Sequence, residues 1–190
     1  YNVSVVDSVT SIAMKNTPKQ NYKYNEALDV TGGKITVTKG SGTQDITITS
    51  SMVTEMDGSP FDPTNLGTRD LKVTYGGQTT TYQVTVKDYV TGIALDPDTV
   101  TGAYNDTLTD IINDNSIKYK VTYAKAGTQA AQPLTDSMVS GYNPTSTSAQ
   151  NLTVTYTDKD SNSATNGDPF VAILKVTLAK INVLVIFRYT

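Results

Sequence analysis

The chain has 190 residues, a formal net charge of −3, and neither cysteine nor histidine. Without cysteine it cannot be held by disulfides, and without histidine it lacks the commonest general base and the commonest transition-metal ligand. The weak net charge and the lack of any lysine or arginine cluster argue against nucleic acid as a partner. No run approaches 20 apolar residues, so no membrane span is expected.

Threonine is abundant, and tyrosine (12) far outnumbers phenylalanine (3) in a chain without tryptophan. Threonine and tyrosine favour strands with one half-wet face, so the composition predicts β-sheet. Short alternating stretches between glycine and proline turns indicate the same. In the first half of the chain these stretches fall at residues 11–14, 22–30, 34–38, 45–49, 71–75 and 81–86, with one possible helical turn near 52–56.

The same series of predicted strands occurs twice in the sequence. The segment that opens at Tyr1 reappears at Tyr82, and Tyr75 reappears at Tyr156 with the same offset. A repeat of this length predicts two domains in series, each long enough to bury a small core. We place domain one at residues 9–89 and domain two at residues 90–179, and we interpret residues 1–8 as the last strand of a preceding repeat.

Residues 180–190 form an apolar tail unlike the preceding sequence. Its run Val183 to Phe187 is too short to cross a bilayer, and as an exposed edge strand it would be prone to pairing. We interpret the tail as the start of a next segment or as an addition to the natural chain. The alternative is a strand that pairs with another molecule.

Domain two carries an insertion in its last hairpin. The offset between the repeats stays constant up to the match of Tyr156 with Tyr75, but it is larger where Leu174 matches Tyr82. The hairpin is therefore eleven positions longer in domain two, around 158–169. Loops accept such insertions at little cost. The insertion is placed at a hairpin tip, where a function could be added.

Three residues of this insertion are candidate calcium ligands. Asp158, Asp160 and Asn162 place oxygen atoms at alternate positions, as calcium-binding loops do. The pattern then departs from such loops, because Ser163 stands where a glycine is required and Pro169 where a glutamate is required. An ordinary polar hairpin tip is the alternative. Residues 110–116 form a second, weaker cluster of carboxylates and amides.

No catalytic or cofactor-binding residue is predicted. The carboxylate pairs Asp96/Asp98 and Asp106/Asp110 have no motif around them and are expected in solvated turns. A group of tyrosines could stack on sugars, but their repeated strand positions favour roles in the core and in strand pairs. These tyrosines are Tyr22, Tyr24, Tyr104, Tyr142 and Tyr156.

Two stretches resemble a known family. Residues 22–38 read YKYNEALDVTGGKITVT, and residues 66–86 read LGTRDLKVTYGGQTTTYQVTV. Both resemble the bacterial immunoglobulin-like domains found in tandem on surface proteins of Gram-positive bacteria. Asn25 replaces the family's usual glycine and Tyr82 its usual phenylalanine, and domain two has residues 111–115 (IINDN) in place of the family's Leu-Thr-Gly-Gly turn.

The resemblance implies an all-β fold of two tandem Ig-like β-sandwiches with Greek-key topology. It leaves no place for helices between Val90 and Ala179. It also implies a non-enzymatic stalk or adhesive module of a secreted or cell-surface bacterial protein, outside the cell. Its partners would be neighbouring Ig-like repeats of the same chain, and a host-surface protein or glycan where the module is adhesive.

Two other functions stay open. One is a polymerising structural subunit, pilus-like or phage-like, in which the terminal strands complete a neighbour's sheet. The other is a carbohydrate-binding accessory of a secreted enzyme.

Overall fold

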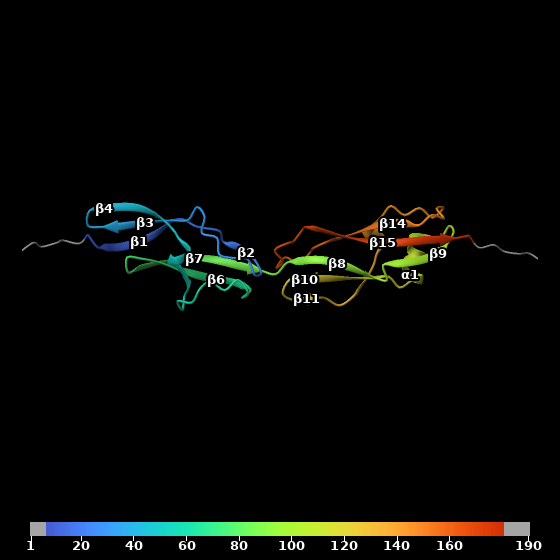
Figure 1. Cartoon of the computed structure of the whole chain (residues 1–190), viewed down its shortest axis with the longest axis horizontal. Helices are drawn as coiled ribbons and strands as arrows, with labels where there is room; N and C mark the ends of the chain where they lie inside the picture. The colour runs from blue at the N-terminus through green and yellow to red at the C-terminus, as the bar shows by residue number, and fades with distance from the viewer. Residues whose placement is uncertain (1–6, 181–190) are drawn as a thin grey trace, which may run out of the picture. The chain divides into compact units, whose positions relative to one another are not determined.

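The computed structural model describes residues 7–180 and divides the chain into two compact units, Tyr1–Tyr89 and Val90–Thr190 (Figure 1). Each unit is built from two small sheets. The strand predicted at residues 1–8 and the tail 180–190 lie, apart from residues 7, 8 and 180, outside the described residues.

Unit 1 is a sandwich of a three-stranded and a four-stranded sheet. The chain passes from one sheet to the other after β1, after β2 and after β4, and a short 3-10 helix precedes β5. The first sheet has the order β1 (Val9–Asn16), β3 (Lys34–Lys39), β4 (Gly42–Thr47), and the second has the order β2 (Asn21–Lys23), β7 (Gln78–Lys87), β6 (Gly67–Tyr75), β5 (Val53–Glu55).

Alternation of side chains along β6 and β7 builds the core of unit 1. Leu71 and Val73 on β6 are fully buried, and in the second half of β7 the alternate residues Tyr82, Val84 and Val86 are buried. The threonines between them face outward, as the period of two requires. The remaining core comes from the facing sheet and from β2, whose Tyr22 is 2% exposed.

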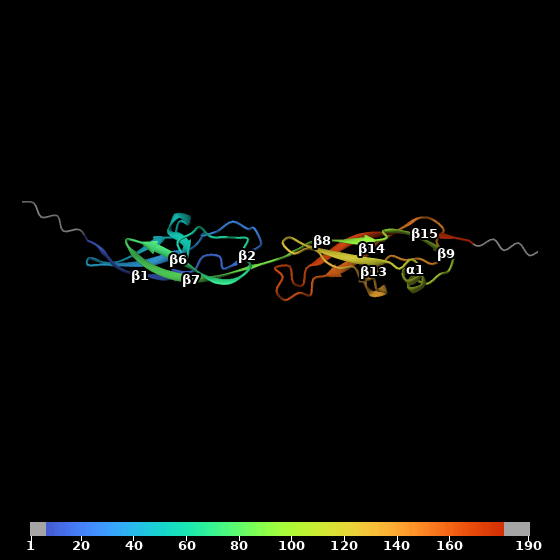
Figure 2. The same cartoon turned by 90° about the horizontal axis from the view of Figure 1, so that it is seen from below.

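Unit 2 repeats this arrangement (Figures 1 and 2). Residues 158–168 join its last two strands, at the position where the changed repeat offset places the insertion. One sheet contains β8 (Val90–Asp96), β10 (Lys118–Tyr123), β11 (Gly127–Thr128) and β12 (Gln132–Pro133), and the other has the order β13 (Val139–Ser140), β14 (Gln150–Thr157), β15 (Pro169–Ala179), β9 (Thr99–Ala103).

The predicted all-β fold class is confirmed, with one feature that the sequence did not indicate. In each unit one pair of strands is parallel: β2 runs parallel to β7, and β9 runs parallel to β15. The other pairings among the described strands are antiparallel. An early strand of each unit therefore lies alongside its last strand and points the same way.

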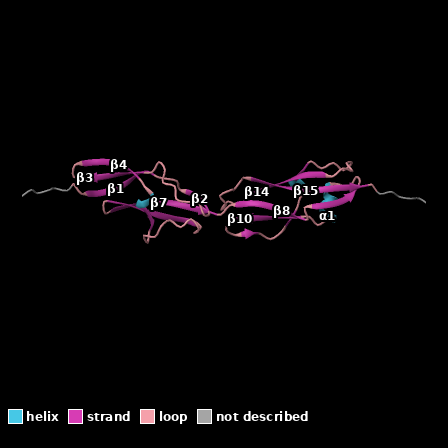
Figure 3. Cartoon of the chain, viewed as in Figure 1, coloured by secondary structure: helices cyan, strands magenta, loops and turns pink. Residues whose placement is uncertain are grey.

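The expectation of no helix between Val90 and Ala179 is wrong. Helix α1 (Leu108–Asp114) lies in unit 2 beside β9 (Figure 3). A capping box starts it: the Thr107 side chain accepts from the Asp110 backbone N–H, and the Asp110 side chain accepts from the Thr107 backbone N–H. This reciprocal bonding satisfies helix donors that would otherwise be unpaired. The helix turns Ile111 and Ile112 into the core.

The space for this helix comes from a glycine. Gly102 pairs with Leu178 in unit 2, as Tyr22 pairs with Val86 in unit 1, so Gly102 and Tyr22 hold the same position in the fold. A Cβ on Gly102 would lie 2.0 Å from Cδ1 of Ile111. Ile111 thus fills the volume that the Tyr22 ring fills in unit 1, and α1 replaces the family's glycine turn.

None of the helices in the described residues is long and apolar enough to cross a membrane.

Candidate functional site

The inserted loop is organised around a buried carboxylate. Asp158 is 1% exposed, and its Oδ2 accepts a hydrogen bond of 2.8 Å from the Thr165 hydroxyl. Its Oδ1 accepts from the Asp160 backbone N–H at 3.0 Å and lies 3.4 Å from the Tyr123 hydroxyl. Both carboxylate oxygens therefore face donors of the protein itself.

The hydrogen bonds continue from this carboxylate to the start of the unit. Ser163 and Thr165, both buried, have their hydroxyl oxygens 2.9 Å apart. The Thr165 hydroxyl also accepts a 2.9 Å bond from the backbone N–H of Val90, the first residue of β8. The loop is thereby tied to a strand 75 residues earlier in the sequence.

Two opposing effects act on the pKa of Asp158. Burial raises it, because a charged carboxylate loses solvation. Hydrogen bonds from Ser163, from the Asp160 N–H and from Thr165 lower it. The bonds outweigh burial, so the pKa of Asp158 lies below its ordinary value and the group is ionised at neutral pH.

The three predicted calcium ligands lie in this loop but play different parts. Asp158 is buried, whereas Asp160 and Asn162 are exposed, and the Asp160 carboxylate accepts from the Asn162 backbone N–H at 2.8 Å. Within residues 7–180 no group of three or more acidic, histidine or cysteine side chains is placed to hold a metal ion. Calcium binding stays a prediction.

The carboxylate pairs considered in the sequence have structural partners. Asp96 forms an ion pair with Lys120 at 3.0 Å. Asp106 accepts from the Ala103 backbone N–H at 2.6 Å, and Asp110 belongs to the capping box of α1. Residues 110–116, interpreted as a weak polar cluster, are mostly helix and turn.

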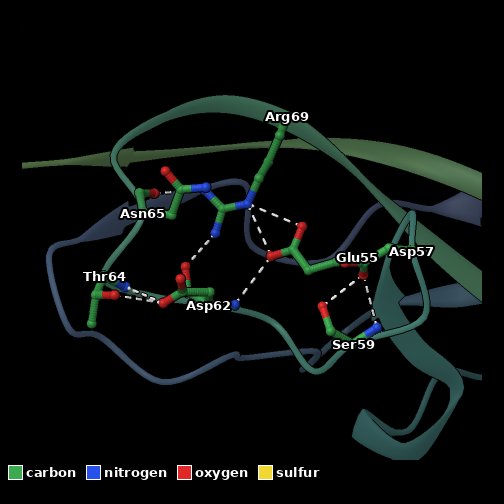
Figure 4. Close-up of polar contacts among 7 residues, drawn as sticks. All are labelled: Glu55, Asp57, Ser59, Asp62, Thr64, Asn65 and Arg69. Carbon is green, nitrogen blue, oxygen red and sulfur yellow. Dashed lines mark hydrogen bonds and ion pairs between the residues drawn. The ribbon is translucent and has the colours of Figure 1, made fainter.

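A polar cluster that the sequence did not indicate lies in unit 1, around Arg69 (Figure 4). Arg69 Nε lies 2.9 Å and 3.1 Å from the two oxygens of Glu55, and the two side chains are only 16% and 14% exposed. The guanidinium also donates to the backbone carbonyls of Asn65, at 2.7 Å, and of Asp62, and it lies 5.1 Å from the Phe61 ring. Arg69 is thus bound on several sides by the loop between β5 and β6.

Two aspartates shape that loop further. Asp62 accepts from the backbone N–H and the hydroxyl of Thr64, and Asp57 accepts from both donors of Ser59. Such bonds stabilise turns locally. The surface here is a shallow polar depression whose side chains largely bond to one another. Arg69 and Glu55 are 14 residues apart on two strands, so no short sequence motif could have indicated their contact.

Unit 2 holds the same loop with an uncharged residue. Gln150, at the position of Arg69, donates to the Asn143 carbonyl at 3.0 Å and accepts from the Asn143 backbone N–H at 2.8 Å. Asn143 in turn accepts from the N–H and hydroxyl of Thr145, as Asp62 does from Thr64. The cluster is therefore a repeated structural device of the fold.

The tyrosines considered for sugar stacking take part in internal contacts. Tyr22 is buried with its ring centroid 5.1 Å from that of Phe61. Tyr142 donates to the Asp106 carbonyl at 2.7 Å, and the Tyr156 ring packs 5.7 Å from the Tyr119 ring. These contacts fit the structural interpretation of the tyrosines.

The paired sheets, the short strands and the parallel pairing of the second strand with the last one define each unit as an Ig-like β-sandwich. Residues 15–86 match the family model described as bacterial Ig-like domain (group 3). The matched residues cover most of unit 1. No curated protein matches the chain.

Proposed function

We propose that the chain is a non-enzymatic spacer module of a secreted or cell-surface bacterial protein. Domains of this family are generally non-catalytic and usually occur in extracellular or surface proteins. The charged and hydroxyl side chains that could have carried chemistry, from Arg69 and Glu55 to Asp158 and Thr165, are bonded to the loops around them. They serve the fold.

The observation that carries the proposal is the parallel pairing of β2 with β7 and of β9 with β15. Within unit 1 the chain enters at one end and leaves β7 at the other (Figure 1). A force between the two ends pulls parallel strands past each other, so it strains their hydrogen bonds together instead of one at a time. The bonds Gln20 O to Thr85 N, at 2.7 Å, and Lys87 O to Tyr24 N, at 2.8 Å, flank the β2–β7 ladder.

Single-molecule force extension tests this role. We expect two unfolding events when the chain is stretched from its ends, each releasing about 80 residues or roughly 280 Å of extended chain. Unfolding of either unit without a resolved force peak would contradict the proposal. As a control, attachment at Ser41, between β3 and β4, and at Gly77, in the turn between β6 and β7, leaves both β2 and β7 outside the pulled segment.

An adhesive role would add a partner such as a host-surface protein or a glycan. A glycan array probed with the chain tests the glycan. Binding to defined glycans that persists at high salt would add adhesion to the spacer role. No binding to any glycan on the array would support the spacer role without glycan adhesion.

A further inference from the structure

The first half of β15 has an edge that no described strand covers. On one side β14 pairs with β15 from Pro169 to Val176, but on the other side β9 pairs only with Lys175–Ala179. The backbone N–H of Lys175 points to this second side, where it donates to the Asp98 carbonyl at 2.8 Å. Because backbone direction alternates along a strand, the N–H and C=O groups of Val171 and Ile173 point the same way.

The side chains on this stretch are apolar and exposed. Val171 is 64% and Ile173 is 48% exposed, among the largest values for apolar side chains in the described residues. Their partners across β14 are Thr155 and Thr153, which carry no charge. β8 packs past this edge but forms its ladder with β10. An apolar edge without charged residues is prone to accept another strand.

Unit 1 provides an internal comparison. Thr79 and Thr81 stand where unit 2 has Val171 and Ile173, and Thr81 faces the charged Lys72 on β6. Further along the same edge, Gln20 Nε2 donates to the Gln83 carbonyl at 3.1 Å, which occupies an edge acceptor. Gln83 corresponds to Lys175, which β9 covers in unit 2, so the two units differ at the threonine positions. The strand is polar there in unit 1, so the fold itself does not require an apolar edge in unit 2.

We propose that this edge of β15 binds residues 181–187 of a second copy of the chain as an added strand. Those residues read INVLVIF, without a charged side chain and rich in strand formers. Seven residues are enough to pair along the six residues of the open stretch 169–174. Strand addition would supply backbone hydrogen bonds along the edge and apolar contacts with Val171 and Ile173.

The geometry favours a second copy over the chain's own tail. The tail follows β15 after Lys180, at the end where β9 occupies the edge. To reach 169–174 in its own molecule, it would have to reverse and pass outside β9. One copy offers one tail and one edge, which is a heterologous contact, and such contacts generate open oligomers. This self-association is independent of the spacer role.

Sedimentation velocity over a concentration series tests the proposal with three variants. We expect residues 1–190 to reach at least about twice the monomer mass near 100 µM, a concentration suited to micromolar affinity. Deletion of residues 181–190 and the double substitution Val171→Thr/Ile173→Thr, which restores the unit 1 residues, should each give monomers. Thr177→Val, on the covered half of β15, is the matched control and should associate like the unchanged chain. A monomeric full chain, or association that survives both the deletion and the double substitution, would overturn the proposal.

Cross-linking identifies the contact directly, because the chain has no cysteine of its own. We expect a mixture of the Ile173→Cys and Val185→Cys variants to form mainly the mixed disulfide on mild oxidation, as read by mass spectrometry. Predominant pairing of Ile173→Cys with itself would show that two β15 edges meet. Predominant pairing of Val185→Cys with itself would show that two tails meet. Either result contradicts the proposed contact.

Discussion

Arg69 and Gln150 occupy the same position in the two units and bind the same point of the loop that follows the short edge strand. Arg69 donates to the carbonyl of Asp62, and Gln150 donates to the carbonyl of Asn143. In unit 1 a second side chain is needed, because Glu55 Oε1 accepts the bond from the Asp62 N–H, at 3.0 Å. In unit 2 the single amide of Gln150 satisfies both the N–H and the carbonyl of Asn143. Unit 1 thus satisfies these two backbone groups of the loop with a charged pair, and unit 2 satisfies them with a single amide.

This difference predicts unequal costs of truncation. Arg69→Ala leaves Glu55 as a largely buried, unpaired charge, so we expect unit 1 to lose about 3 kcal/mol of unfolding free energy. Gln150→Ala leaves only neutral backbone groups, and unit 2 should lose about 1 kcal/mol. Urea denaturation of each unit measures both values. The double variant Glu55→Gln/Arg69→Gln should recover much of the loss, and a double variant as unstable as Arg69→Ala would refute this account.

Tyr82 offers a stabilising substitution. Its ring is buried at 6% exposure, and among the described residues its hydroxyl is the one buried side-chain polar atom without a hydrogen-bond partner. Burial also raises the pKa of this hydroxyl. Because an unsatisfied buried group costs free energy, Tyr82→Phe should raise the unfolding free energy of unit 1 by about 1 kcal/mol.

Tyr22 is the matched control for that substitution. Its hydroxyl donates to the Asp29 carbonyl at 3.0 Å and accepts from the Asp29 N–H at 3.3 Å. Tyr22→Phe therefore removes bonds that exist, and it should lower the unfolding free energy of unit 1 by about 1 kcal/mol. Thermal denaturation should show shifts of opposite sign for the two variants, and shifts of equal sign would contradict the assignment.

Gly102 is expected to resist even a methyl group. Gly102→Ala would bring Cβ to 2.0 Å from Cδ1 of Ile111, so unit 2 should lose about 1–3 kcal/mol through overpacking. Adding Ile111→Val removes that Cδ1 and should restore part of the loss. Gly92→Ala, which meets no atom within 4 Å, is the control and should change little. Equal losses for the two glycines would show that the fit of α1 does not determine the cost at Gly102.

Asp158 should make the stability of unit 2 depend on pH. Its pKa is lowered in the folded state, so its contribution is complete above the ordinary pKa of about 3.9 and is lost as the pH falls through the folded value. Asp158→Asn should remove that contribution, about 2 kcal/mol at pH 7. The loss should be smaller at pH 3. Urea titrations at the two pH values measure the difference.

The same variant tests calcium. Because both oxygens of Asp158 already accept from protein donors, we expect the loss on Asp158→Asn to be equal in EDTA and in millimolar calcium. Asp160→Asn, on the exposed side of the loop, is the control. A loss that grows in calcium for both variants would instead establish the metal site that the spacing of Asp158, Asp160 and Asn162 predicted.

Much of the fold was predictable because β6 and β7 obey a strict period of two. Leu71, Val73, Val84 and Val86 alternate with polar residues, and the Gly76-Gly77 pair marks the turn between the strands. Helix α1 was not predictable in the same way. Ile111 and Ile112 are adjacent, so they show neither a helical nor a strand period in so short a segment.

The functional interpretation of side chains was harder for a physical reason. Oxygen atoms at alternate positions, as in Asp158 and Asp160, suit a cation but equally suit bonds to backbone N–H groups two residues on. Burial distinguishes the two cases, and the surroundings of Asp158 include Tyr123, which is 35 residues earlier in the sequence, and Thr165, further along the same loop. The Arg69–Glu55 pair is similarly fixed by the register of two strands and not by a local motif.

The bond from Val90 to Thr165 has a consequence for how unit 2 comes apart. It joins the first residue of β8 to the loop that precedes the last strand, β15. Proteolytic cleavage within the exposed residues 159–162 would leave the sheets in place but weaken the hydrogen bonds of Asp158, which hold Thr165 in position for its bond to Val90. The start of β8 would then fray after a cleavage some seventy residues further along the sequence.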